Sequence, residues 1–360
     1  MTRVLVVSAS IGEGHDLPAR RLATALRERG TDAAIIDGLD AAGPVARALA
    51  GGATQLESRA GNVAFDIGHR FVSEWRPTRR FSARTIHAVG RRGLLRAVTA
   101  FAPDVVVSTY PGASEILGRL RLAGALGVPV VSAVTDLASL RYWAHPGVDL
   151  HLLIHPESEA EVRSIAGPTA RVQAAYGFSD PAFRHPPAPE AARRAIGLPL
   201  GGPLVVVSGG GWAVGDLGTA VDEALRAQAR VLVLAGRNEG ARARLAARYA
   251  ERDDVAVWGF TEQMPAVLAA AGVLVHSTAG LTVLEALMSG CRPISFGWGR
   301  GHIRANNRAY ARFGLAEVAA TPADLRAALA RALAAPRAAP WAPDLPEAAD
   351  LVLAEAHHPA

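Results

Sequence analysis

The sequence contains no lysine, so all 38 of its basic residues are arginines. Codon bias is a sufficient cause of this absence, and the chemical consequence is the same whatever the cause. Each basic position presents a planar guanidinium that stays charged and matches the geometry of a phosphate group. The formal net charge is only +5, and so small an excess does not predict a general nucleic-acid-binding protein.

Cysteine and long apolar runs are also scarce. Cys291 is the one cysteine, which excludes an internal disulfide and any metal site built from several cysteines. No run of about 18 apolar residues occurs, so no transmembrane helix is expected. Residues 4–7 have the pattern of a strand rather than of a signal peptide. We therefore expect a cytoplasmic protein, with peripheral contact to the inner face of the cell membrane as an open alternative.

Apolar segments alternate with helical patterns along most of the chain, and half of the residues are apolar. Strands are predicted at residues 4–8, 33–37, 104–108, 128–133, 150–154, 204–208, 231–234, 255–258, 273–276 and 293–296. Strands that are apolar throughout and are separated by helices indicate parallel sheets covered on both faces. The predicted fold class is α/β, with two Rossmann-like, doubly wound domains.

Composition suggests where these domains begin and end. We assign residues 1–180 to the first domain, 181–202 to a proline-rich linker, 203–335 to the second domain and 336–360 to a tail rich in proline and alanine that contains a helix. Two such domains joined by a hinge imply a cleft. In sheets of this kind ligands bind at the carboxyl ends of the strands.

Residues 69–96 depart from the alternation, because they contain eight arginines and a single acid, Glu74, with aromatic and aliphatic residues between them. A basic amphipathic segment of this kind is typical of docking on an anionic membrane surface. The alternative is a solvated helix face that packs on the sheet.

The most informative motif is at residues 277–285, where a turn of small residues follows one predicted strand and opens a helix. Backbone N–H groups at such a helix start, together with the helix dipole, favour an anion. Glu285, one turn into the helix, can accept hydrogen bonds from two hydroxyl groups. A phosphate cradle beside a diol acceptor suits a nucleoside diphosphate. An ordinary turn with a solvated glutamate remains an alternative.

Other loops follow strands at the same expected edge of the second domain. They are the glycine loop at 208–212, the stretches 236–238 and 259–261, and the polar segment 301–307. Glycine loops can form a second anion nest, and guanidinium, imidazole and amide groups can bind diphosphate or sugar hydroxyls. Each of these segments is, taken singly, more often only a turn.

Two side chains of the first domain suit acid–base chemistry. His15 follows the first strand in the loop at 12–15, and the ordinary pKa of histidine, near 7, suits removal of a proton from a hydroxyl group. Asp136 follows another strand and could serve as a second acid or base or orient His15. The alternative for Asp136 is the N-cap of a helix.

Taken together, these segments resemble the two-domain GT-B glycosyltransferases. The nearest branch contains the monogalactosyldiacylglycerol synthases and processive diacylglycerol glucosyltransferases, and the lipid II-forming N-acetylglucosaminyltransferase is related to it. Three segments carry the resemblance, which spans residues 1 to 320: the loop at 12–15, the crossover at 176–183 and the run from 258 through 277–285 to 306. The third is the most specific, because order and spacing agree over some 50 residues.

The resemblance implies an inverting transfer of a hexose from a UDP-sugar to a hydroxyl acceptor, favoured as a lipid such as diacylglycerol, with no metal or other cofactor. It places His15 near the acceptor hydroxyl or the donor diphosphate, Glu285 on the ribose, and Gly259, Phe260 and Met264 near the uracil. The donor contacts that it implies are completed by Gly12, Gly14, Gly210, Gly211, Arg237, Ser277, Thr278, Ala279, Gly280, Thr282, His302 and Asn306. Trp143 and His145 would lie on the acceptor side.

The sequence departs from the family pattern in three places. Glu13 replaces a loop glycine, so either Glu13 or His15 could be the base. His302 and Ile303 stand where relatives often carry Gln-Glu or Gln-Gln, which leaves the sugar open. Residues 142–146 lack the family order His-Pro-x-Trp, so a non-lipid small molecule stays open as the acceptor. Two other functions also remain open: a UDP-sugar epimerase on the same fold, and a catalytically idle nucleotide-sugar-binding subunit.

Overall fold

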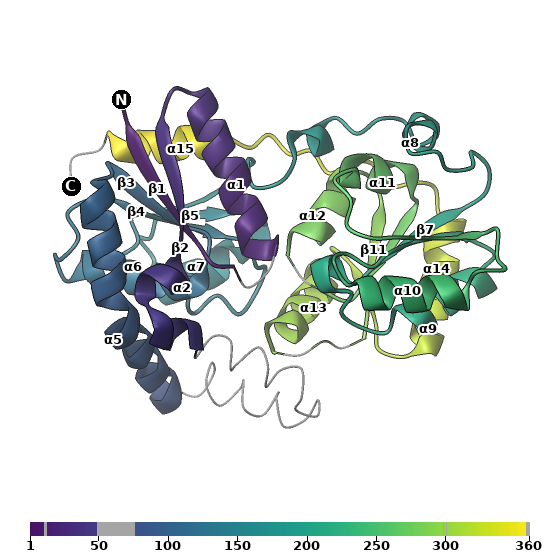
Figure 1. Cartoon of the computed structure of the whole chain (residues 1–360), viewed down its shortest axis with the longest axis horizontal. Coiled ribbons are helices and arrows are strands. Elements are labelled where there is room, and N and C mark those ends of the chain that lie inside the picture. Colours follow the sequence, from purple (N-terminus) through teal and green to yellow (C-terminus); the bar gives the residue numbers. More distant parts are fainter. Residues whose placement is uncertain (11–12, 49–75, 279, 298, 300, 358–360) are drawn as a thin grey trace. The chain divides into compact units, whose positions relative to one another are not determined.

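A computed structural model describes all residues except 11–12, 49–75, 279, 298, 300 and 358–360, and the side chains of residues 13 and 76–80 (Figure 1). The chain folds into two compact units. Unit 1 consists of Met1–Ser179 and Asp344–Ala360, and unit 2 of Asp180–Pro343. Each unit contains a six-stranded parallel sheet with helices on its faces, which confirms the predicted fold class.

The sheet of unit 1 has the strand order β2-β1-β3-β4-β5-β6. Its strands are β1 Arg3–Ser8, β2 Asp32–Asp37, β3 Val105–Ser108, β4 Val130–Val134, β5 Leu150–Leu153 and β6 Val172–Ala174. The middle strands are buried on both faces because their apolar runs are continuous, as in β3 and β4. The short edge strand β6 lacks such a run and was not expected from the sequence.

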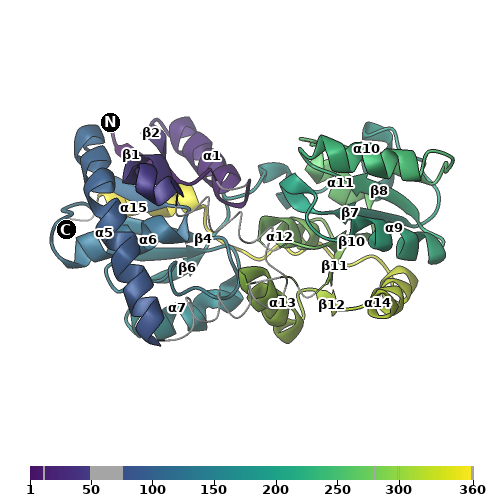
Figure 2. The same cartoon turned by 60° about the horizontal axis from the view of Figure 1, so that its bottom comes forward.

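Helices cover both faces of this sheet. One face carries α1 Glu13–Glu28 and α15 Ala348–Ala356, and the other carries α2 Gly38–Ala42, α5 Arg76–Phe101 and α6 Pro111–Leu122 (Figures 1 and 2). A short η1 Pro156–Ser158 and α7 Glu159–Ala166 complete the unit. Leu94 and Val98 of α5 pack with Ile116 and Leu117 of α6 over strands β1 and β3. This core forms because each helix turns one apolar stripe toward the sheet.

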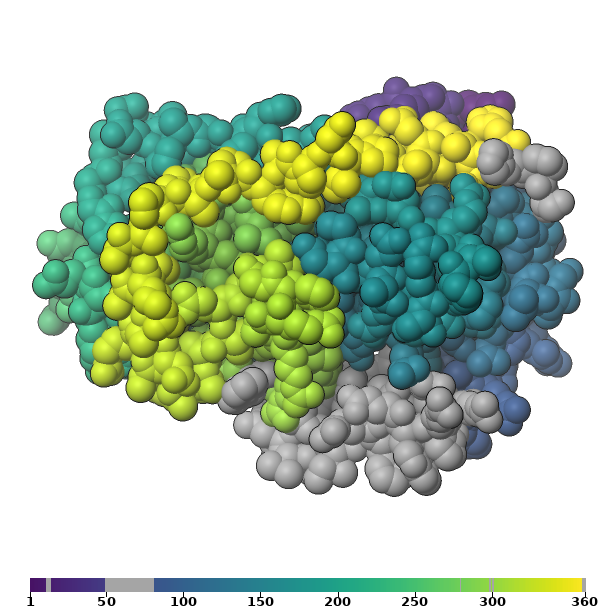
Figure 3. Space-filling view, turned by 180° about the vertical axis from the view of Figure 1, so that it is seen from behind, coloured from purple at the N-terminus to yellow at the C-terminus, as the bar shows by residue number. Residues whose placement is uncertain are grey.

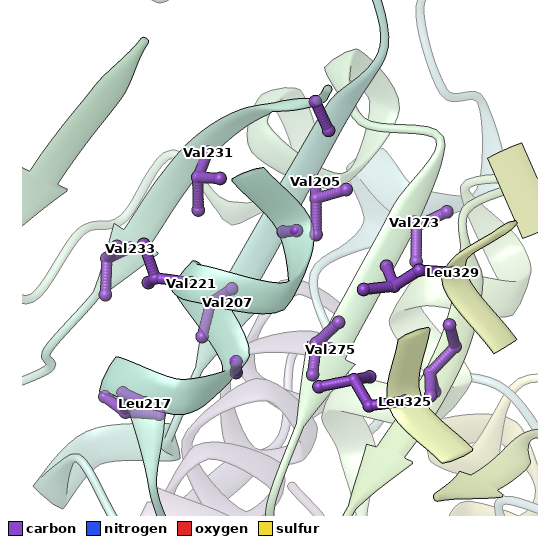
Figure 4. Close-up of a cluster of buried hydrophobic side chains, with 14 of the residues drawn as sticks. Val205, Val207, Leu217, Val221, Val231, Val233, Val273, Val275, Leu325 and Leu329 are labelled. Carbon is purple, nitrogen blue, oxygen red and sulfur yellow. The ribbon is translucent and has the colours of Figure 1, made fainter. Parts of the chain in front are cut away.

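The sheet of unit 2 has the order β12-β11-β10-β7-β8-β9. Its strands are β7 Leu204–Ser208, β8 Arg230–Leu234, β9 Val255–Trp258, β10 Val273–His276, β11 Arg292–Phe296 and β12 Glu317–Ala319. The α-helices of unit 2 are α8 Pro189–Ala195, α9 Leu217–Arg226, α10 Glu239–Arg248, α11 Met264–Ala270, α12 Leu281–Met288, α13 Gly301–Phe313 and α14 Pro322–Ala334. Figure 4 shows one face of its core, where valines of β7, β8 and β10 meet leucines of α9 and α14. Each fully buried valine or leucine of this kind contributes about 1.5–3 kcal/mol.

The segments that the sequence analysis assigned to a linker and to a C-terminal tail are parts of the two units. Residues 181–202, which the sequence suggests as a linker, form η2 Pro181–Arg184 and α8 within unit 2, and α8 packs against α11. The end of the chain folds back on unit 1, where α15 lies against α1 and β3. In the space-filling view the segment after α14 runs along the molecular surface (Figure 3).

Candidate active site

Three loops meet at one edge of the sheet of unit 2, because β8, β7 and β10 are neighbours and all run in the same direction. These loops are residues 209–215 after β7, 236–238 after β8 and 277–280 after β10. The sequence-predicted residues Gly210, Gly211, Arg237, Ser277, Thr278 and Gly280 are therefore brought together. This edge is the carboxyl end of a parallel sheet, where such folds bind their ligands.

The glycine loop after β7 is fixed from both neighbouring strands. The Arg237 N–H donates to the Gly211 carbonyl at 2.8 Å, and the Ser277 hydroxyl donates to the Val214 carbonyl. A side chain at Gly236 would not fit, since its Cβ would lie 2.5 Å from the Gly211 carbonyl oxygen. The loop is thus ordered before any ligand arrives. It presents Trp212, which is 59% exposed and was not among the predicted contacts.

Gly280 sets the conformation in which the turn after β10 opens α12. Its φ is 94°, a value that side chains disfavour, so glycine is required there. In the first turn of α12 the Val283 N–H donates to the Gly280 carbonyl at 3.3 Å, whereas the N–H groups of Leu281 and Thr282 come before the first acceptor that the helix offers. The Gly280 N–H itself donates to the Tyr310 hydroxyl at 3.1 Å. The amides of the helix start are thus the groups suited to an anion.

Glu285 lies on α12, one turn beyond this helix start, and its side chain is buried with only 5% exposed. The alternative of a solvated glutamate is therefore wrong. A carboxylate can accept several hydrogen bonds, and ribose hydroxyls can donate them. Its role on a ribose stays a prediction.

An aromatic side chain stands at the end of β9 in the same unit. Phe260 is 46% exposed, and the Arg237 guanidinium carbon lies 3.8 Å from the centre of its ring. Gly259 precedes it, and Met264 begins α11 a few residues later. A cation over one ring face holds the ring in place. An exposed aromatic ring is a surface on which a base could stack.

The helix α13 carries the polar groups predicted to contact the sugar. His302 is exposed in its first turn, and the buried Asn306 donates from Nδ2 to the His302 carbonyl at 2.8 Å. The next residue, Asn307, accepts from the Ser295 hydroxyl at 2.7 Å and so ties α13 to β11. Asn307 is a positioning contact that the sequence analysis had not singled out.

In unit 1, His15 lies in the first turn of α1 and is locked to the end of β3. Its Nδ1 is 3.0 Å from the Thr109 carbonyl oxygen, and the Thr109 hydroxyl donates to the His15 carbonyl at 3.0 Å. Because a carbonyl can only accept, Nδ1 carries the proton when the ring is neutral, and Nε2 carries the lone pair. A general base at Nε2 is compatible with this tautomer.

Two other strand ends hold the same turn of α1. The Ser8 hydroxyl donates to Asp16 at 2.5 Å, and the Thr135 hydroxyl is 3.5 Å from the Gly14 carbonyl oxygen. That carbonyl would bond to the N–H four residues later in an uninterrupted helix, but Pro18 has no N–H. The start of α1 is therefore positioned by β1, β3 and β4 together.

Aromatic rings flank His15. The ring centres of Tyr110 and Trp143 lie 5.4 and 5.8 Å from that of the imidazole. The Trp143 indole N–H donates to the Asp136 carboxylate at 2.9 Å. Asp136 lies in a loop after β4 and opens no helix, so the N-cap alternative is wrong. Asp136 and His15 are brought to the same neighbourhood, with Trp143 between them.

His145 and Trp143, predicted on the acceptor side, are both buried. His145 Nδ1 accepts from the Gly147 N–H at 3.0 Å, and its backbone N–H donates to His151 Nε2 at 3.3 Å. Burial, with the charge of Arg119, lowers the pKa of His145 to about 4, so the ring is neutral. These hydrogen bonds indicate a structural role for His145, and its contact with an acceptor stays a prediction.

Several predicted residues fall outside the described part of the chain. Gly12 and Ala279 are among them, as is the side chain of Glu13, whereas Gly14 is exposed on α1. Of the basic stretch 69–96, residues 69–75 and the side chains of 76–80 also lie outside it. The described remainder is helix α5, which buries Leu94 and exposes the arginines at 84, 91, 92 and 96.

The described residues offer neither a cluster of metal ligands nor a membrane-spanning helix. No group of three or more histidine, cysteine, aspartate or glutamate residues there could hold a metal ion. None of the helices described has both the length and the apolar character that crossing a bilayer requires.

Comparison with known proteins matches both units to glycosyltransferases. The family model of monogalactosyldiacylglycerol (MGDG) synthase matches residues 15–175, and that of glycosyl transferases group 1 matches residues 210–335. The chain has the GT-B fold and resembles the glycosyltransferases of that fold. The first match includes His15 and the second includes the loops of the candidate site in unit 2, so the chain resembles the family that its motifs indicated.

One curated relative is the processive diacylglycerol beta-glucosyltransferase of Staphylococcus saprophyticus subsp. saprophyticus, 21% identical over 201 residues, which are 55% of this chain and 51% of the relative. The chain thus spans about half the length of the curated relative that it matches.

Solved structures share the fold of the chain. Spinosyn rhamnosyltransferase SpnG is 15% identical, with a TM-score of 0.64 over 99% of this chain and all of the other. Acinetobacter baumannii MurG is 15% identical, with a TM-score of 0.59 over 98% of this chain and all of the other. Arabidopsis thaliana UGT89C1, complexed with UDP, is 13% identical, with a TM-score of 0.55 over 92% and 91% of the two chains.

Proposed function

We propose that the protein is an inverting glycosyltransferase that moves a hexose from a UDP-sugar to a hydroxyl acceptor, with a lipid such as diacylglycerol as the favoured acceptor. The observation that carries this proposal is the start of α12, where Gly280 has a positive φ and the buried Glu285 lies one turn further on. The same fold holds UDP in UGT89C1, and the curated relative acts on diacylglycerol, which supports the choice of donor and acceptor.

The donor would be held by unit 2. The diphosphate would accept hydrogen bonds from the first amides of α12, and its charge is favoured by the dipole of that helix. Glu285 would accept from the ribose hydroxyls, and Phe260 with Arg237 would offer a stacking surface to the uracil. His302 and Asn306 of α13 would face the sugar. No metal is expected, since helix amides can stabilise the charge that develops on the departing UDP.

The chemical step would be a single displacement with inversion. The acceptor oxygen attacks the anomeric carbon, the bond from that carbon to the diphosphate oxygen breaks, and UDP leaves with the bonding electrons. His15 Nε2 would take the proton of the acceptor hydroxyl, because the Nδ1 bond to the Thr109 carbonyl leaves the lone pair at Nε2. Glu13 is the second candidate for this base.

The test of the proposal is UDP release from UDP-glucose, UDP-galactose and UDP-N-acetylglucosamine, with and without diacylglycerol in detergent micelles. We expect release that depends on the acceptor, and a product of inverted anomeric configuration. Replacing His15 by alanine should lower kcat at least about tenfold, since a general base usually contributes about 10²–10⁴-fold. The matched control is H357A, which removes an exposed histidine at the end of α15.

Other outcomes would assign the other functions. Interconversion of UDP-sugars without an acceptor would identify an epimerase. Binding of UDP without any turnover would identify a nucleotide-sugar-binding subunit. If H15A turned over at the wild-type rate, His15 would be removed from the mechanism and Glu13 would become the candidate base.

Docking of the basic stretch on an anionic membrane at the inner face of the cell membrane is part of the same proposal. The exposed arginines of α5 and Phe81, which is 74% exposed, support it. Sedimentation with vesicles of phosphatidylglycerol should remove the protein from solution, whereas vesicles of phosphatidylcholine should not. Equal sedimentation with both, or with neither, would contradict this docking.

A further inference from the structure

The turn that opens α12 is contacted by a buried imidazole from the strand before it. His276 is the last residue of β10 and is 1% exposed. Its Nδ1 lies 2.7 Å from the carbonyl oxygen of Thr278, two residues later. The Thr278 peptide group is therefore held by a side chain that comes from the sheet rather than from the loop.

A second buried side chain holds the other end of the turn. Tyr310 of α13 is fully buried, and its hydroxyl accepts the Gly280 N–H at 3.1 Å. The two rings also contact each other edge to face, with centres 6.3 Å apart and planes at 86°. His276 and Tyr310 thus form one packed pair that bonds to Thr278 and to Gly280.

The donor in the first of these bonds is fixed by burial. Burial lowers the pKa of His276 to about 4, so the ring is neutral near pH 7. The Thr278 carbonyl can only accept, so Nδ1 carries the proton. The other nitrogen, Nε2, is buried and has no hydrogen-bond partner in the described part of the chain. Leaving a buried acceptor unsatisfied costs stability that an apolar side chain would not cost. A histidine at this position is therefore expected to have a role that offsets this loss of stability.

Tyr310 is itself held in place by the helix that carries it. Asn307, one turn earlier on α13, accepts from Ser295 at 2.7 Å and donates to the Gly297 carbonyl at 3.3 Å. The same helix carries Asn306 and His302, which are the candidate sugar contacts. The Tyr310 hydroxyl therefore connects the candidate sugar subsite to the turn at the diphosphate subsite.

We propose that His276 and Tyr310 are positioning residues for the donor diphosphate, which hold the Thr278 carbonyl and the Gly280 N–H in place before the nucleotide binds. This inference rests on the proposed function of the same site. Backbone groups that are already held lose less conformational entropy on binding, so the affinity for the diphosphate rises without any added contact to it. Neither side chain needs to touch the ligand for this effect.

The first test compares two variants that each lose one buried tyrosine hydroxyl. Y310F removes the acceptor for Gly280, and Y249F removes a hydroxyl that bonds to Gly218 and Asp222, away from the turn. Titration calorimetry with UDP should show affinity about tenfold weaker in Y310F, the equivalent of one hydrogen bond. In Y249F it should change less than about twofold, a change too small to represent a lost bond.

The second test uses His276 with a conservative rescue. H276L removes the donor to Thr278, whereas H276N keeps an amide nitrogen close to the position of Nδ1. We expect H276L to weaken UDP binding and H276N to restore most of it. In turnover assays the loss in H276L should fall mainly on the KM for the UDP-sugar rather than on kcat.

The outcomes separate this inference from the proposed function. If the wild-type protein bound no UDP, both the proposed function and the positioning role would be rejected. Wild-type protein that binds UDP, with Y310F and H276L equal to it, would overturn the positioning role alone. Equal losses in Y310F and Y249F would show general destabilisation and would also overturn it.

Discussion

At the scale of single residues, the candidate base is defined by a reciprocal pair of hydrogen bonds rather than by its own side chain alone. His15 donates to the Thr109 carbonyl, and Thr109 returns a bond from its hydroxyl to the His15 backbone. The first bond selects the tautomer, and the second fixes the turn of α1 that carries the imidazole. A displacement of about 1 Å in such a group can cost a large part of a catalytic rate.

The second bond of this pair can be removed without changing the shape of the side chain. T109V loses the hydroxyl but keeps the carbonyl that accepts from His15. We expect kcat to fall by about three- to tenfold, the equivalent of about one hydrogen bond, with the KM for the UDP-sugar unchanged. T109S, which restores the hydroxyl, should recover the rate. A rise in KM with constant kcat would show that Thr109 does not act through His15.

Glu285 offers a second residue-scale test, because its carboxylate is buried beside the helix start that would hold the diphosphate. E285A should weaken UDP binding by about tenfold or more, since hydrogen bonds to a charged group are worth about 1.5–3 kcal/mol. E262A, at an exposed glutamate before α11, is the control. Calorimetry that gave equal affinity for wild type and E285A would refute the ribose role.

At the scale of elements, helix α5 combines an arginine-rich exposed face with an unusually close approach to α2. The approach is possible because Gly93 and Gly90 face the neighbouring helices. A methyl group at Gly93 would lie 1.8 Å from the Ala41 carbonyl oxygen. The contact thus depends on the absence of a single side-chain carbon.

G93A should therefore push α5 away from α2 and destabilise unit 1. We expect a loss of about 1–3 kcal/mol, which is typical when a well-packed contact receives an extra carbon. G127A is the control, because no atom lies within 4 Å of a Cβ built there. Denaturant unfolding measures both variants, and a G93A midpoint equal to that of wild type would contradict the packing described.

The elements themselves could largely be predicted from the sequence, since buried parallel strands have continuous apolar runs. The short edge strands β6 and β12 could not, because three residues carry too little pattern. The loops of the candidate site follow strands and could be found in the same way. Thr109 and Tyr310 could not, since their partners lie 94 and 30 residues away and only the fold brings them together.

At the scale of the whole molecule, buried neutral histidines make stability depend on pH. Burial lowers the pKa of four of them to about 4, namely His145, His151, His155 and His276. In the unfolded chain each has the ordinary value of 6.5. Between these two values the unfolded state binds more protons than the folded state, so the free energy of unfolding must fall as the pH falls.

We therefore expect stability to be full above about pH 6.5 and to decline from there toward pH 4. Each histidine contributes a slope of up to about 1.4 kcal/mol per pH unit in this window. Calorimetric melting at pH 7.5 and pH 5.0 should show a lower Tm at pH 5.0, with proton uptake on unfolding. Equal Tm values at the two pH values would contradict the neutral, buried state of these rings.

The return of α15 to unit 1 has a consequence for how the protein is made. Its Glu355 pairs with Arg171, and its Asp350 pairs with Arg29 of α1, so the last helix covers part of the first unit. A ribosome delivers all of unit 2 before it delivers α15. During that interval the nascent first unit lacks the helix that covers part of its surface, and exposed apolar surface of this kind favours aggregation.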